Sequence, residues 1–405
     1  MIKVLHINCS DVGSTGKIIE DISAHSQVLS VLCTPHIKKP ESSIKKFKTS
    51  FPYEQGIYKR VCRIYGLRYG FAPVSTARII HHIKKEKPQV VHFHSANMNT
   101  VNLYRVLKFL KRKNIPTVVT NHAEFFYTGS CGYAHECDRW KTGCGKCPRL
   151  TYASDSKLFD RTHTAWKKMK AAFGGFKKIQ IVSVSPWVDE RVKQAPIMNE
   201  LPHDVITNGI NTQCFSFKKD FDIHKEYNLS PDTKIIFHVT SGFSRSENHI
   251  KGGRFILALA EALKDEPVVI LVAGSHEQGI KVPDNVILLG NLLNQEILAA
   301  HYATADLAIL ASKRETFSMP VAESLCCGTP IVGFKAGGPE SIAMPEYSEF
   351  VSYGDVDALK EAVLKWLDCK KTIGAQVISE KAKELYAASV MAEKYVSVYQ
   401  SLIKD

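Results

Sequence analysis

The sequence lacks any apolar stretch long enough to cross a bilayer. Its longest apolar segments, such as residues 268–274, fall far short of the roughly 20 residues that a membrane-spanning helix needs. Residues 1–9 lack the three regions of a signal peptide and instead predict a first strand. We therefore expect a cytoplasmic protein without a transmembrane segment.

The composition also lacks the biases of disordered, collagen-like and coiled-coil proteins. Hydrophobic residues make up 44% and charged residues 23%, which is ordinary for a globular protein. No short-period repeat is visible. At roughly 100–200 residues per domain, the 405 residues predict two or three domains.

Acidic residues are scarce in the first half of the chain. Residues 1–200 contain 33 Lys and Arg against 14 Asp and Glu, a net charge of +19, whereas residues 201–405 contain 20 against 26, a net charge of −6. A basic half attracts anions, and nucleic acid, an anionic membrane surface and phosphorylated substrates are the candidates. A solvated lysine-rich surface is the simpler alternative, which the asymmetry between the halves disfavours.

Short apolar segments alternate with helical patterns along the chain, which predicts parallel strands joined by helical crossovers. The expected strands of the first half span residues 4–7, 28–33, 87–94, 117–121 and 179–183, and those of the second half span 235–240, 268–273, 286–289, 307–311 and 331–334. Residues 38–50 are rich in Lys and Ser and predict an exposed loop.

This pattern predicts an α/β protein with two doubly wound, Rossmann-like parallel-sheet domains. We expect an N-terminal domain at residues 1–205 with a Cys-rich insertion at 125–150, and a C-terminal domain at 206–385. A last helix at about 386–405 should pack back on the N-terminal domain. Because ligands of such sheets bind beyond the carboxyl ends of the strands, the two domains should face a central cleft.

Two glutamates, Glu315 and Glu323, lie eight residues apart after a predicted strand. If a helix covers this interval, both carboxylates point to the same side, and the helix N-terminus beside them favours bound anions. An exposed acidic helix is the alternative. The glycines Gly337 and Gly338 at the end of the next strand favour a site, because backbone N–H groups there can approach a ligand closely.

The whole set of motifs resembles the donor-site signature of the large retaining glycosyltransferase family 4, which has the GT-B fold. Besides Glu315-x7-Glu323 and Gly337-Gly338-Pro339-Glu340, the resemblance rests on Gly290, Tyr302, Ala305-Asp306, Ser312 and Ile331-Val332. Asn208-Gly209-Ile210 resembles the interdomain element, with Asn211 in place of Asp, and Ser183–Pro186 resembles the end of the N-terminal domain. The similarity covers nearly the whole chain.

The resemblance implies transfer of a sugar from a nucleotide-diphosphate sugar to a hydroxyl of a growing bacterial surface glycan, with retention of the anomeric configuration. It implies a glycan or lipid-diphosphate-linked acceptor, such as a lipopolysaccharide, capsule or exopolysaccharide precursor. No cofactor is required for catalysis. The basic stretches at 84–87, 108–113 and 167–170 suit a peripheral position at the inner face of the membrane, although each alone is typical of a solvated helix.

The family pattern also assigns roles to single residues. Glu315 approaches the donor sugar, Glu323 holds the ribose hydroxyls, and Lys251, with Arg245 a few residues before it, neutralises the leaving diphosphate. The expected substrate-binding residues are Gly13, Gly16, Asn208, Gly290, Ser318, Met319, Glu323, Gly337 and Gly338. Backbone amides near Gly13–Gly16 and Gly337–Gly338 should also stabilise the leaving group, although the first pair is equally compatible with a tight turn.

His122 follows the strand at 117–121 and matches the family histidine near the donor sugar, so we expect it to be catalytic. The family often has Asp after this histidine. Here Ala123 stands there, and Glu124 is the possible substitute. His94 also ends a strand and is a weaker candidate.

Four of the eleven cysteines form the pattern Cys131-x5-Cys137-x6-Cys144-x2-Cys147. Four thiolates can complete a closed tetrahedral zinc site, which leaves no open position for catalysis. Four reduced, buried thiols are the equal alternative, since disulfides are rare in the cytosol. The surrounding residues resemble a polysaccharide-synthesis subgroup of the family.

Two other functions remain open from the sequence. A GT-B sugar-nucleotide epimerase shares the fold, but the Glu pair and the Cys-rich segment favour transfer. A zinc-containing nucleic-acid-binding protein would use the basic half and the four cysteines. Because the aromatic residues do not alternate with basic ones in a known RNA-binding motif, we expect no nucleic-acid partner.

Overall fold

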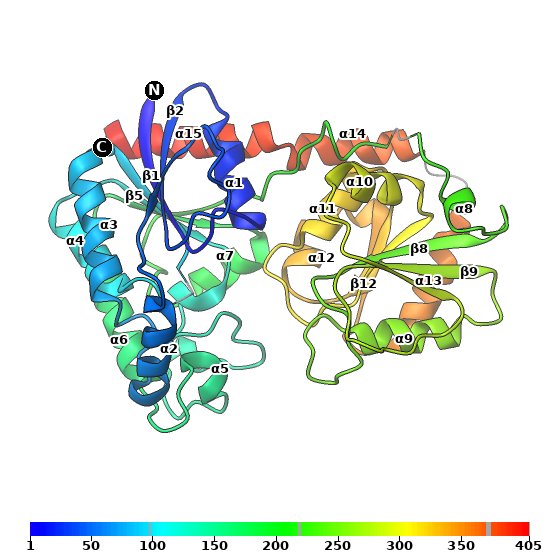
Figure 1. The fold of residues 1–405 in the computed structure, drawn as a ribbon, viewed down its shortest axis with the longest axis horizontal. Helices are drawn as coiled ribbons and strands as arrows, with labels where there is room; N and C mark the ends of the chain where they lie inside the picture. Colours follow the sequence, from blue (N-terminus) through cyan, green and yellow to red (C-terminus); the bar gives the residue numbers. More distant parts are fainter. Residues whose placement is uncertain (97–98, 218–219, 370–373, 405) are drawn as a thin grey trace. The chain divides into compact units, whose positions relative to one another are not determined.

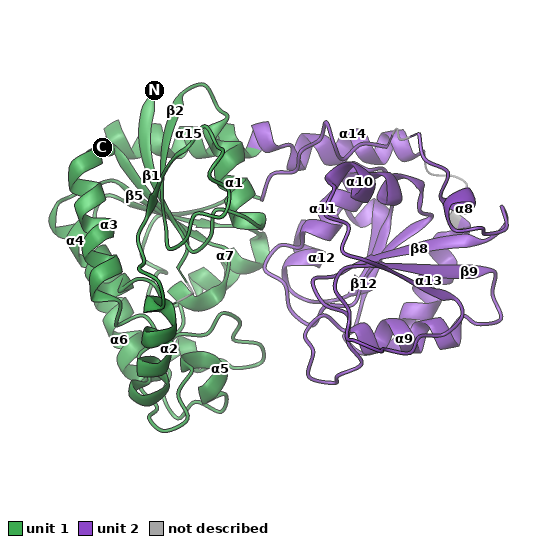
Figure 2. Cartoon of the chain, viewed as in Figure 1, with its two compact units in different colours: residues 1–207, 391–405 green, residues 208–390 purple. Residues whose placement is uncertain are grey.

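The computed structural model describes residues 1–96, 99–217, 220–369 and 374–404. The chain forms two compact units, coloured separately in Figure 2. Unit 1 contains residues 1–207 and 391–405, and unit 2 contains residues 208–390. In the described part of the chain, no helix is both long and apolar enough to cross a membrane.

Unit 1 is built on a parallel sheet in which the described strands follow the order β3-β2-β1-β4-β5-β6-β7. The strands are β1 (Ile2–Asn8), β2 (Val28–Thr34), β3 (Lys45–Lys48), β4 (Val90–Ser95), β5 (Thr117–Asn121), β6 (Ile179–Ser183) and β7 (His203–Val205). Their connections are the helices α1 (Ser14–Ser23), α2 (Glu54–Tyr65), α3 (Pro73–Glu86), α4 (Leu103–Arg112), α5 (Leu150–Ser154), α6 (Thr162–Phe173) and α7 (Pro186–Lys193), with the short 3-10 helices η1 (Glu124–Phe126) and η2 (Arg139–Lys141).

The C-terminal helix α15 (Ala388–Lys404) supplies part of the core of unit 1. Its apolar face packs on the sheet beside α1, and the shared cluster comprises Val4, Ile18, Ile22, Val28, Val90, Val118, Val182, Ile206, Met391, Tyr395, Val396, Tyr399 and Leu402. The buried tyrosine hydroxyls of α15 also have hydrogen-bond partners on the sheet. The Tyr399 hydroxyl lies 2.7 Å from Nδ1 of the buried His92, and the Tyr395 hydroxyl lies 3.0 Å from Thr120 Oγ1.

Unit 2 contains a second parallel sheet, whose described strands follow the order β10-β9-β8-β11-β12-β13. The strands are β8 (Lys234–Val239), β9 (Val268–Ala273), β10 (Val286–Gly290), β11 (Leu307–Leu310), β12 (Ile331–Phe334) and β13 (Ser348–Val351). The helical elements are α8 (Ile223–Glu226), α9 (Gly253–Ala262), α10 (Gln295–Thr304), α11 (Met319–Cys326), α12 (Gly338–Ile342), η3 (Pro345–Tyr347), α13 (Val356–Cys369) and α14 (Ala375–Tyr386).

Helices cover both faces of the second sheet, as Figure 1 shows. Helices α9 and α13 pack together on one face and share its apolar core with the strands, whereas α11 packs against α10 and α14. Strands that are buried on both faces are usually apolar at nearly every position, as in the Val-Val-Ile-Leu-Val-Ala sequence of β9. This pattern makes the central strands visible in the sequence.

Both sheets reverse their strand order in the middle. The chain moves outward from β1 to β2 and β3, and then returns to place β4 on the other side of β1. In unit 2 the same reversal leaves β8 between β9 and β11. Loops diverge where the order reverses, and this point at the carboxyl ends of the strands is the usual ligand site of doubly wound sheets. The predicted fold class, two doubly wound α/β domains, is therefore confirmed.

The expected loop at residues 38–50 is wrong in part, because β3 occupies Lys45–Lys48 and pairs in parallel with β2. This strand lies at the sheet edge and consists of three lysines and one phenylalanine. Charged residues are common on edge strands, since they oppose pairing with other chains, and they hide the apolar pattern of a strand. The edge strands β7 and β13 and helix α2 were also missed.

We predict that Tyr399→Phe lowers the free energy of unfolding by about 1–3 kcal/mol. The substitution keeps the ring but removes the partner of the buried His92 Nδ1, and a buried polar atom without its hydrogen bond carries a desolvation penalty. Urea unfolding measures the change. The matched control is Ser397→Ala on the exposed side of the same helix, where we expect a change within about 0.5 kcal/mol. Equal midpoints for Tyr399→Phe and the wild type would contradict the assigned role of the hydroxyl.

Candidate active site

In unit 2 the candidate site centres on an ion pair between two predicted catalytic residues. Lys251 Nζ lies 2.6 Å from Glu315 Oε1, and both side chains are partly buried. The two loops are also joined through their backbones, because the Lys313 N–H donates to the Ile250 carbonyl at 2.7 Å. Lys251 follows β8 and Glu315 follows β11, so the pair belongs to the loops that diverge at the reversal of strand order.

Gly252 allows Lys251 to come this close to the end of β11. Its φ is +70°, and an added Cβ would overlap the carbonyl oxygen of Ala311. Such a left-handed conformation with no space for a side chain favours glycine strongly. The glycine after Lys251 is therefore required by the packing of the two loops.

No helix covers the whole interval from Glu315 to Glu323, so the condition for both carboxylates to share one helix face is not met. Helix α11 begins only at Met319, after Ser318 with φ +86°. Glu315 instead forms an isolated parallel bridge with Gly337. The carboxylate is therefore positioned by main-chain pairing between two loops, and only Glu323 lies on the helix.

The predicted role of the amides at Gly337 and Gly338 also needs correction. The Gly337 N–H donates to both carboxylate oxygens of Glu340, at 2.8 and 3.0 Å, and the Gly338 N–H donates to the Glu315 carbonyl at 2.9 Å. Both amides are thus used inside the protein. An added Cβ at Gly338 would overlap the backbone of Thr316, so this glycine serves the close approach of the loops.

The N-terminus of α11 presents polar groups beside the ion pair. Ser318 is 5% exposed, and among the described residues its hydroxyl has no hydrogen-bond partner. Met319 and Pro320 open the helix, whose dipole favours anions at this end. Further along α11, Glu323 is buried near the Tyr302 hydroxyl. Burial, with the charge of Glu323 adding to it, raises the pKa of Tyr302 well above its usual value.

Three other predicted residues lie elsewhere in unit 2. Arg245 is exposed and donates to the carbonyl of Lys281. Gly290 ends β10 with φ +69°, and Asn208 is a buried residue at the beginning of the unit. Within the described ranges, none of the three hydrogen-bonds with Lys251 or Glu315. The structure therefore unites two of the four predicted catalytic residues and leaves Arg245 apart from them.

His238, which no motif in the sequence marked as a candidate, lies in β8 and is 1% exposed. Its Nδ1 lies 3.0 Å from the Ile309 carbonyl and must donate to it, because a carbonyl only accepts. Nε2 is then an acceptor, and it has no partner within the described part of the chain. Burial lowers the pKa of His238 to about 4, so the ring is neutral. An apolar strand pattern with one histidine was the only available signal.

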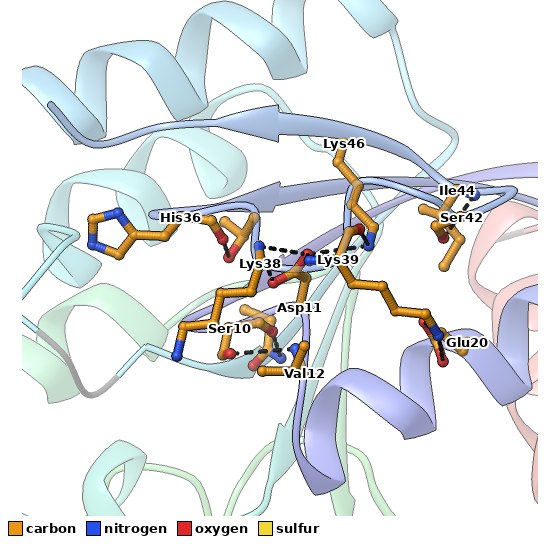
Figure 3. Close-up of polar contacts among 12 residues, drawn as sticks. Ser10, Asp11, Val12, Glu20, His36, Lys38, Lys39, Ser42, Ile44 and Lys46 are labelled. Carbon is orange, nitrogen blue, oxygen red and sulfur yellow. Dashed lines mark hydrogen bonds and ion pairs between the residues drawn. The ribbon is translucent and has the colours of Figure 1, made fainter.

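In unit 1, a buried aspartate organises the glycine loop before α1 (Figure 3). The Asp11 carboxylate accepts from the backbone N–H groups of Lys38 and Lys39 and from Lys46 Nζ, all at 3.0–3.1 Å. Burial opposes ionisation of Asp11, but these donors hold its pKa below the usual value. No pattern in the sequence predicts this contact, which joins the loop after β1 to the loop after β2.

The two glycines of this loop differ in their surroundings. A Cβ at Gly16 would lie 2.7 Å from the carbonyl carbon of Asp11, so Gly16 is required by the packing of α1. Gly13 has φ +80°, and an added Cβ would meet nothing within 4 Å. The surroundings of Gly13 thus leave space for a ligand, although its positive φ also suits a tight turn, whereas the close packing of α1 accounts for Gly16.

His122 ends a chain of histidines that crosses three neighbouring strands. Its Nε2 lies 3.3 Å from His94 Nδ1, and His94 Nε2 lies 3.0 Å from His6 Nδ1. His6 Nε2 then lies 3.1 Å from the Ser30 hydroxyl. Burial lowers the pKa of His122 and of His6 to about 3, and burial with neighbouring histidines lowers that of His94 well below its usual value. The three histidine rings are therefore uncharged.

Glu124 does not serve as the carboxylate partner suggested for His122. It is fully buried, pairs with Arg191 Nε, accepts the Tyr127 hydroxyl at 2.9 Å and accepts the Ala134 N–H at 2.5 Å. These contacts fix the start of the Cys-rich segment. The ring of His122 instead lies against His94, the weaker of the two histidine candidates in the sequence.

The four cysteines of the Cys-rich segment line one cavity of about 20 Å³. Burial raises the pKa of Cys131 to about 12, with the other three cysteines adding to the effect. The described cysteines are all free thiols. The fold thus brings together four residues that are spread over the segment.

A basic groove of about 510 Å³ lies between α4 and α6 on unit 1. Five of its lining residues are basic, namely Arg105, Lys108, Lys111, Arg112 and Lys168, and the others are Leu67, Gly70, Asn102 and Tyr104. Two of the basic stretches noted in the sequence therefore form a single surface.

Comparison with known families agrees with this architecture. Residues 31–213 match the model described as Glycosyltransferase Family 4, and residues 237–369 match the model described as Glycosyl transferases group 1. The chain belongs to glycosyltransferase family 4. Family membership makes it an enzyme that uses nucleotide sugars and needs no catalytic metal, and it disfavours the epimerase and nucleic-acid hypotheses.

Individual relatives have low sequence identity to this chain but are similar to it over most of its length. The chain is 24% identical over 335 residues to a protein of Escherichia coli named as a colanic acid biosynthesis glycosyl transferase, WcaC, covering 78% of this chain and 77% of that protein. The structure resembles sucrose-phosphate synthase from Thermosynechococcus elongatus, with a TM-score of 0.71, 15% identity and 100% of both chains covered. It also resembles Anabaena HepE in complex with UDP-glucose, with a TM-score of 0.64, 15% identity and 99% and 100% of the two chains covered. These structures establish the GT-B fold.

The buried histidines predict a loss of stability on acidification. His6, His92 and His94 are 0% exposed, and burial lowers the pKa of each far below 6.5. As the pH is lowered from 7 to 5, the unfolded chain takes up protons that the folded protein does not. The free energy of unfolding therefore decreases as the pH falls. Each histidine should contribute about 2 kcal/mol of this loss by pH 5.

Urea unfolding at pH 8, 7, 6 and 5 tests this expectation. Between pH 8 and 7 these histidines are mostly neutral in both states, so this interval is an internal control in which each contributes only about 0.1–0.2 kcal/mol. His94→Gln should reduce the slope below pH 6.5 by about one proton. A slope that is unchanged by this substitution would show that His94 is not buried as a neutral group.

Proposed function

We propose that this enzyme is a retaining glycosyltransferase that moves a sugar from a nucleotide-diphosphate sugar to a hydroxyl of a growing, lipid-linked bacterial surface glycan. The observation that carries the proposal is the Lys251–Glu315 ion pair at the reversal of strand order, beside the N-terminus of α11. The surface-glycan acceptor is supported by the name of the colanic acid relative and by the basic surface of unit 1.

The donor would bind across the loops of unit 2. The carboxylate of Glu323 accepts two hydrogen bonds, which suits the paired hydroxyls of the ribose. The diphosphate competes with Glu315 for the Lys251 ammonium and lies near the α11 N-terminus, where Ser318 offers a hydroxyl and Met319 lies in the first helical turn. Glu315, freed from Lys251, then faces the donor sugar.

Transfer with retention would proceed by attack of the acceptor on the face from which the nucleotide leaves. The bond between the anomeric carbon and the phosphate oxygen breaks, and a bond to the acceptor oxygen forms. The leaving phosphate oxygen takes the acceptor proton. Charge builds up on that phosphate, so its stabilisation by Lys251 is the main contribution of the protein. We assign to the neutral ring of His122 a hydrogen bond to the donor sugar or phosphate.

We further propose that the enzyme works at the inner face of the cytoplasmic membrane. The basic groove, lined by Arg105, Lys108, Lys111, Arg112 and Lys168, supports attachment to an anionic surface. Each basic side chain near an anionic bilayer contributes about 1 kcal/mol before screening by salt. This attachment would bring unit 1 to a lipid-linked acceptor without a membrane-spanning helix.

We predict that Glu315→Gln lowers the rate of sugar transfer by about 100-fold or more, because the change removes a charge beside the reacting sugar while keeping the shape of the side chain. A thermal-shift screen with UDP, GDP and their common sugar conjugates first identifies the donor. Binding at 100 times the dissociation constant should stabilise the protein by about 2.7 kcal/mol. Release of nucleotide in the presence of membrane extract containing lipid-linked glycans then measures turnover.

The matched control is Glu261→Gln, which removes an exposed carboxylate of α9 in the same unit. It should leave both the thermal shift and turnover unchanged, whereas Glu323→Gln should weaken the thermal shift. Full turnover by Glu315→Gln would reject the site assignment. The absence of any shift with nucleotides or nucleotide sugars would reject the proposed donor site.

A co-sedimentation assay with vesicles tests membrane attachment. Binding to vesicles with about 30% anionic phospholipid should fall at least tenfold when Arg105, Lys108 and Arg112 are all replaced by Gln, because about 1 kcal/mol is lost per charge. The control replaces three exposed basic residues of α2, Lys59, Arg60 and Arg63, by Gln. Equal losses in both triple variants would show a diffuse charge effect and would overturn the role of the groove.

A further inference from the structure

The segment between η1 and α5 is unusually poor in regular structure. Residues 127–149 contain only the three-residue helix η2. Loops longer than about 12–15 residues are uncommon in compact domains unless something orders them. Trp140, which is 1% exposed, supplies a small apolar centre, and the contacts of Glu124 fix only the start of the segment.

The four cysteines provide the means to order the rest. Cys131, Cys137, Cys144 and Cys147 come from separate parts of the segment, yet all four line the same cavity of about 20 Å³. A space of this size holds a single water-sized particle. It is therefore suited to one ion and too small for a substrate.

The backbone of Gly129 packs closely against one of the sulfur atoms. Gly129 can approach only because it lacks a side chain, since a Cβ there would lie 2.8 Å from Cys144 Sγ and 2.7 Å from the Thr162 carbonyl.

Charged side chains of both signs lie around the cluster. Zinc with four thiolates carries a net charge of −2. Arg139 lines the cavity and its guanidinium donates a hydrogen bond of 3.2 Å to the Gly145 carbonyl, whereas the Asp160 carboxylate accepts from the Cys147 N–H at 2.6 Å and adds negative charge. A positive side chain fixed beside the ligands offsets part of the negative charge.

We propose that Cys131, Cys137, Cys144 and Cys147 bind one zinc ion in a closed tetrahedral site that orders residues 127–149. Each thiol gives up its proton when it binds, and no oxidation or reduction occurs. Four thiolates leave no open position, so the ion is structural. It fixes the segment that begins five residues after His122, and it does not depend on the proposed donor or acceptor.

A buried histidine cluster is the rival metal site. Ring nitrogens of His6, His92 and His94 lie within 4.8 Å of one another. Both nitrogens of each ring already have a partner, so a metal there would break several buried hydrogen bonds. The sulfur atoms of the cysteines are spread more widely than these nitrogens, and zinc would draw them to the separation of about 3.8 Å that a tetrahedral thiolate site requires.

Metal analysis of the purified full-length protein tests the proposal directly. We expect about one zinc ion per chain after dialysis, and intense visible absorption from a tetrahedral thiolate site when cobalt replaces zinc. Cys144→Ser with Cys147→Ser should lose the metal and make residues 127–149 sensitive to protease. Cys137→His should retain it, because three thiolates and one imidazole also bind zinc.

The matched control is Cys9→Ser, which removes a partly exposed thiol outside the cluster and should keep the full zinc content. Less than about 0.1 zinc ion per wild-type chain, or a disulfide within the segment, would overturn the proposal. If the double variant fails to fold, the wild-type zinc content and cobalt spectrum still decide. The thermal shift with nucleotides reports unit 2 separately, so failure of the zinc site and failure of the proposed function are distinguishable.

Discussion

The reversal of strand order in each parallel sheet is the constraint on which the candidate sites depend. Because β8 has β9 on one side and β11 on the other, the loops that leave β8 and β11 diverge and expose the carboxyl ends of both strands. Lys251 and Glu315 come from these loops and meet there. In unit 1 the same reversal lies between β1 and β4, where Gly13 follows one strand and His94 ends the other.

The polar side chains of unit 2 are positioned largely by main-chain contacts. Glu315 lies in a bridge with Gly337, Gly252 lets the Lys251 loop approach β11, and Glu340 holds the amide of Gly337. Backbone pairing of this kind fixes a side chain without using its charged group. The Lys251 ammonium and the Glu315 carboxylate are therefore held by the backbone and by each other, so a ligand can replace either partner of the ion pair. A charge paired with several side chains could not be released as easily.

Unit 1 combines a basic surface with a group of buried, uncharged histidines. Its lysines and arginines lie on helices and edges, whereas the histidines of β1 and β4 are fully buried and hydrogen-bonded to one another, to Thr120 and to Tyr399. Burial keeps these rings uncharged, so they contribute orientation without adding to the positive charge of the unit. The C-terminal helix completes this interior, because its tyrosines supply hydroxyls as well as apolar surface.

The sequence alone determined the class of fold, because strands buried on both faces read as nearly continuous apolar runs, as β9, β11 and β12 do. It also determined which residues to consider in unit 2, through the Glu pair and the glycines, and it marked the four cysteines. Tertiary structure alone decided the contacts. It placed Glu315 in a loop bridge, directed Glu124 to Arg191, revealed Asp11 and His238, and formed β3 from a lysine-rich edge. These outcomes depend on pairing between segments far apart in the chain, and local patterns of polarity carry no information about such pairing.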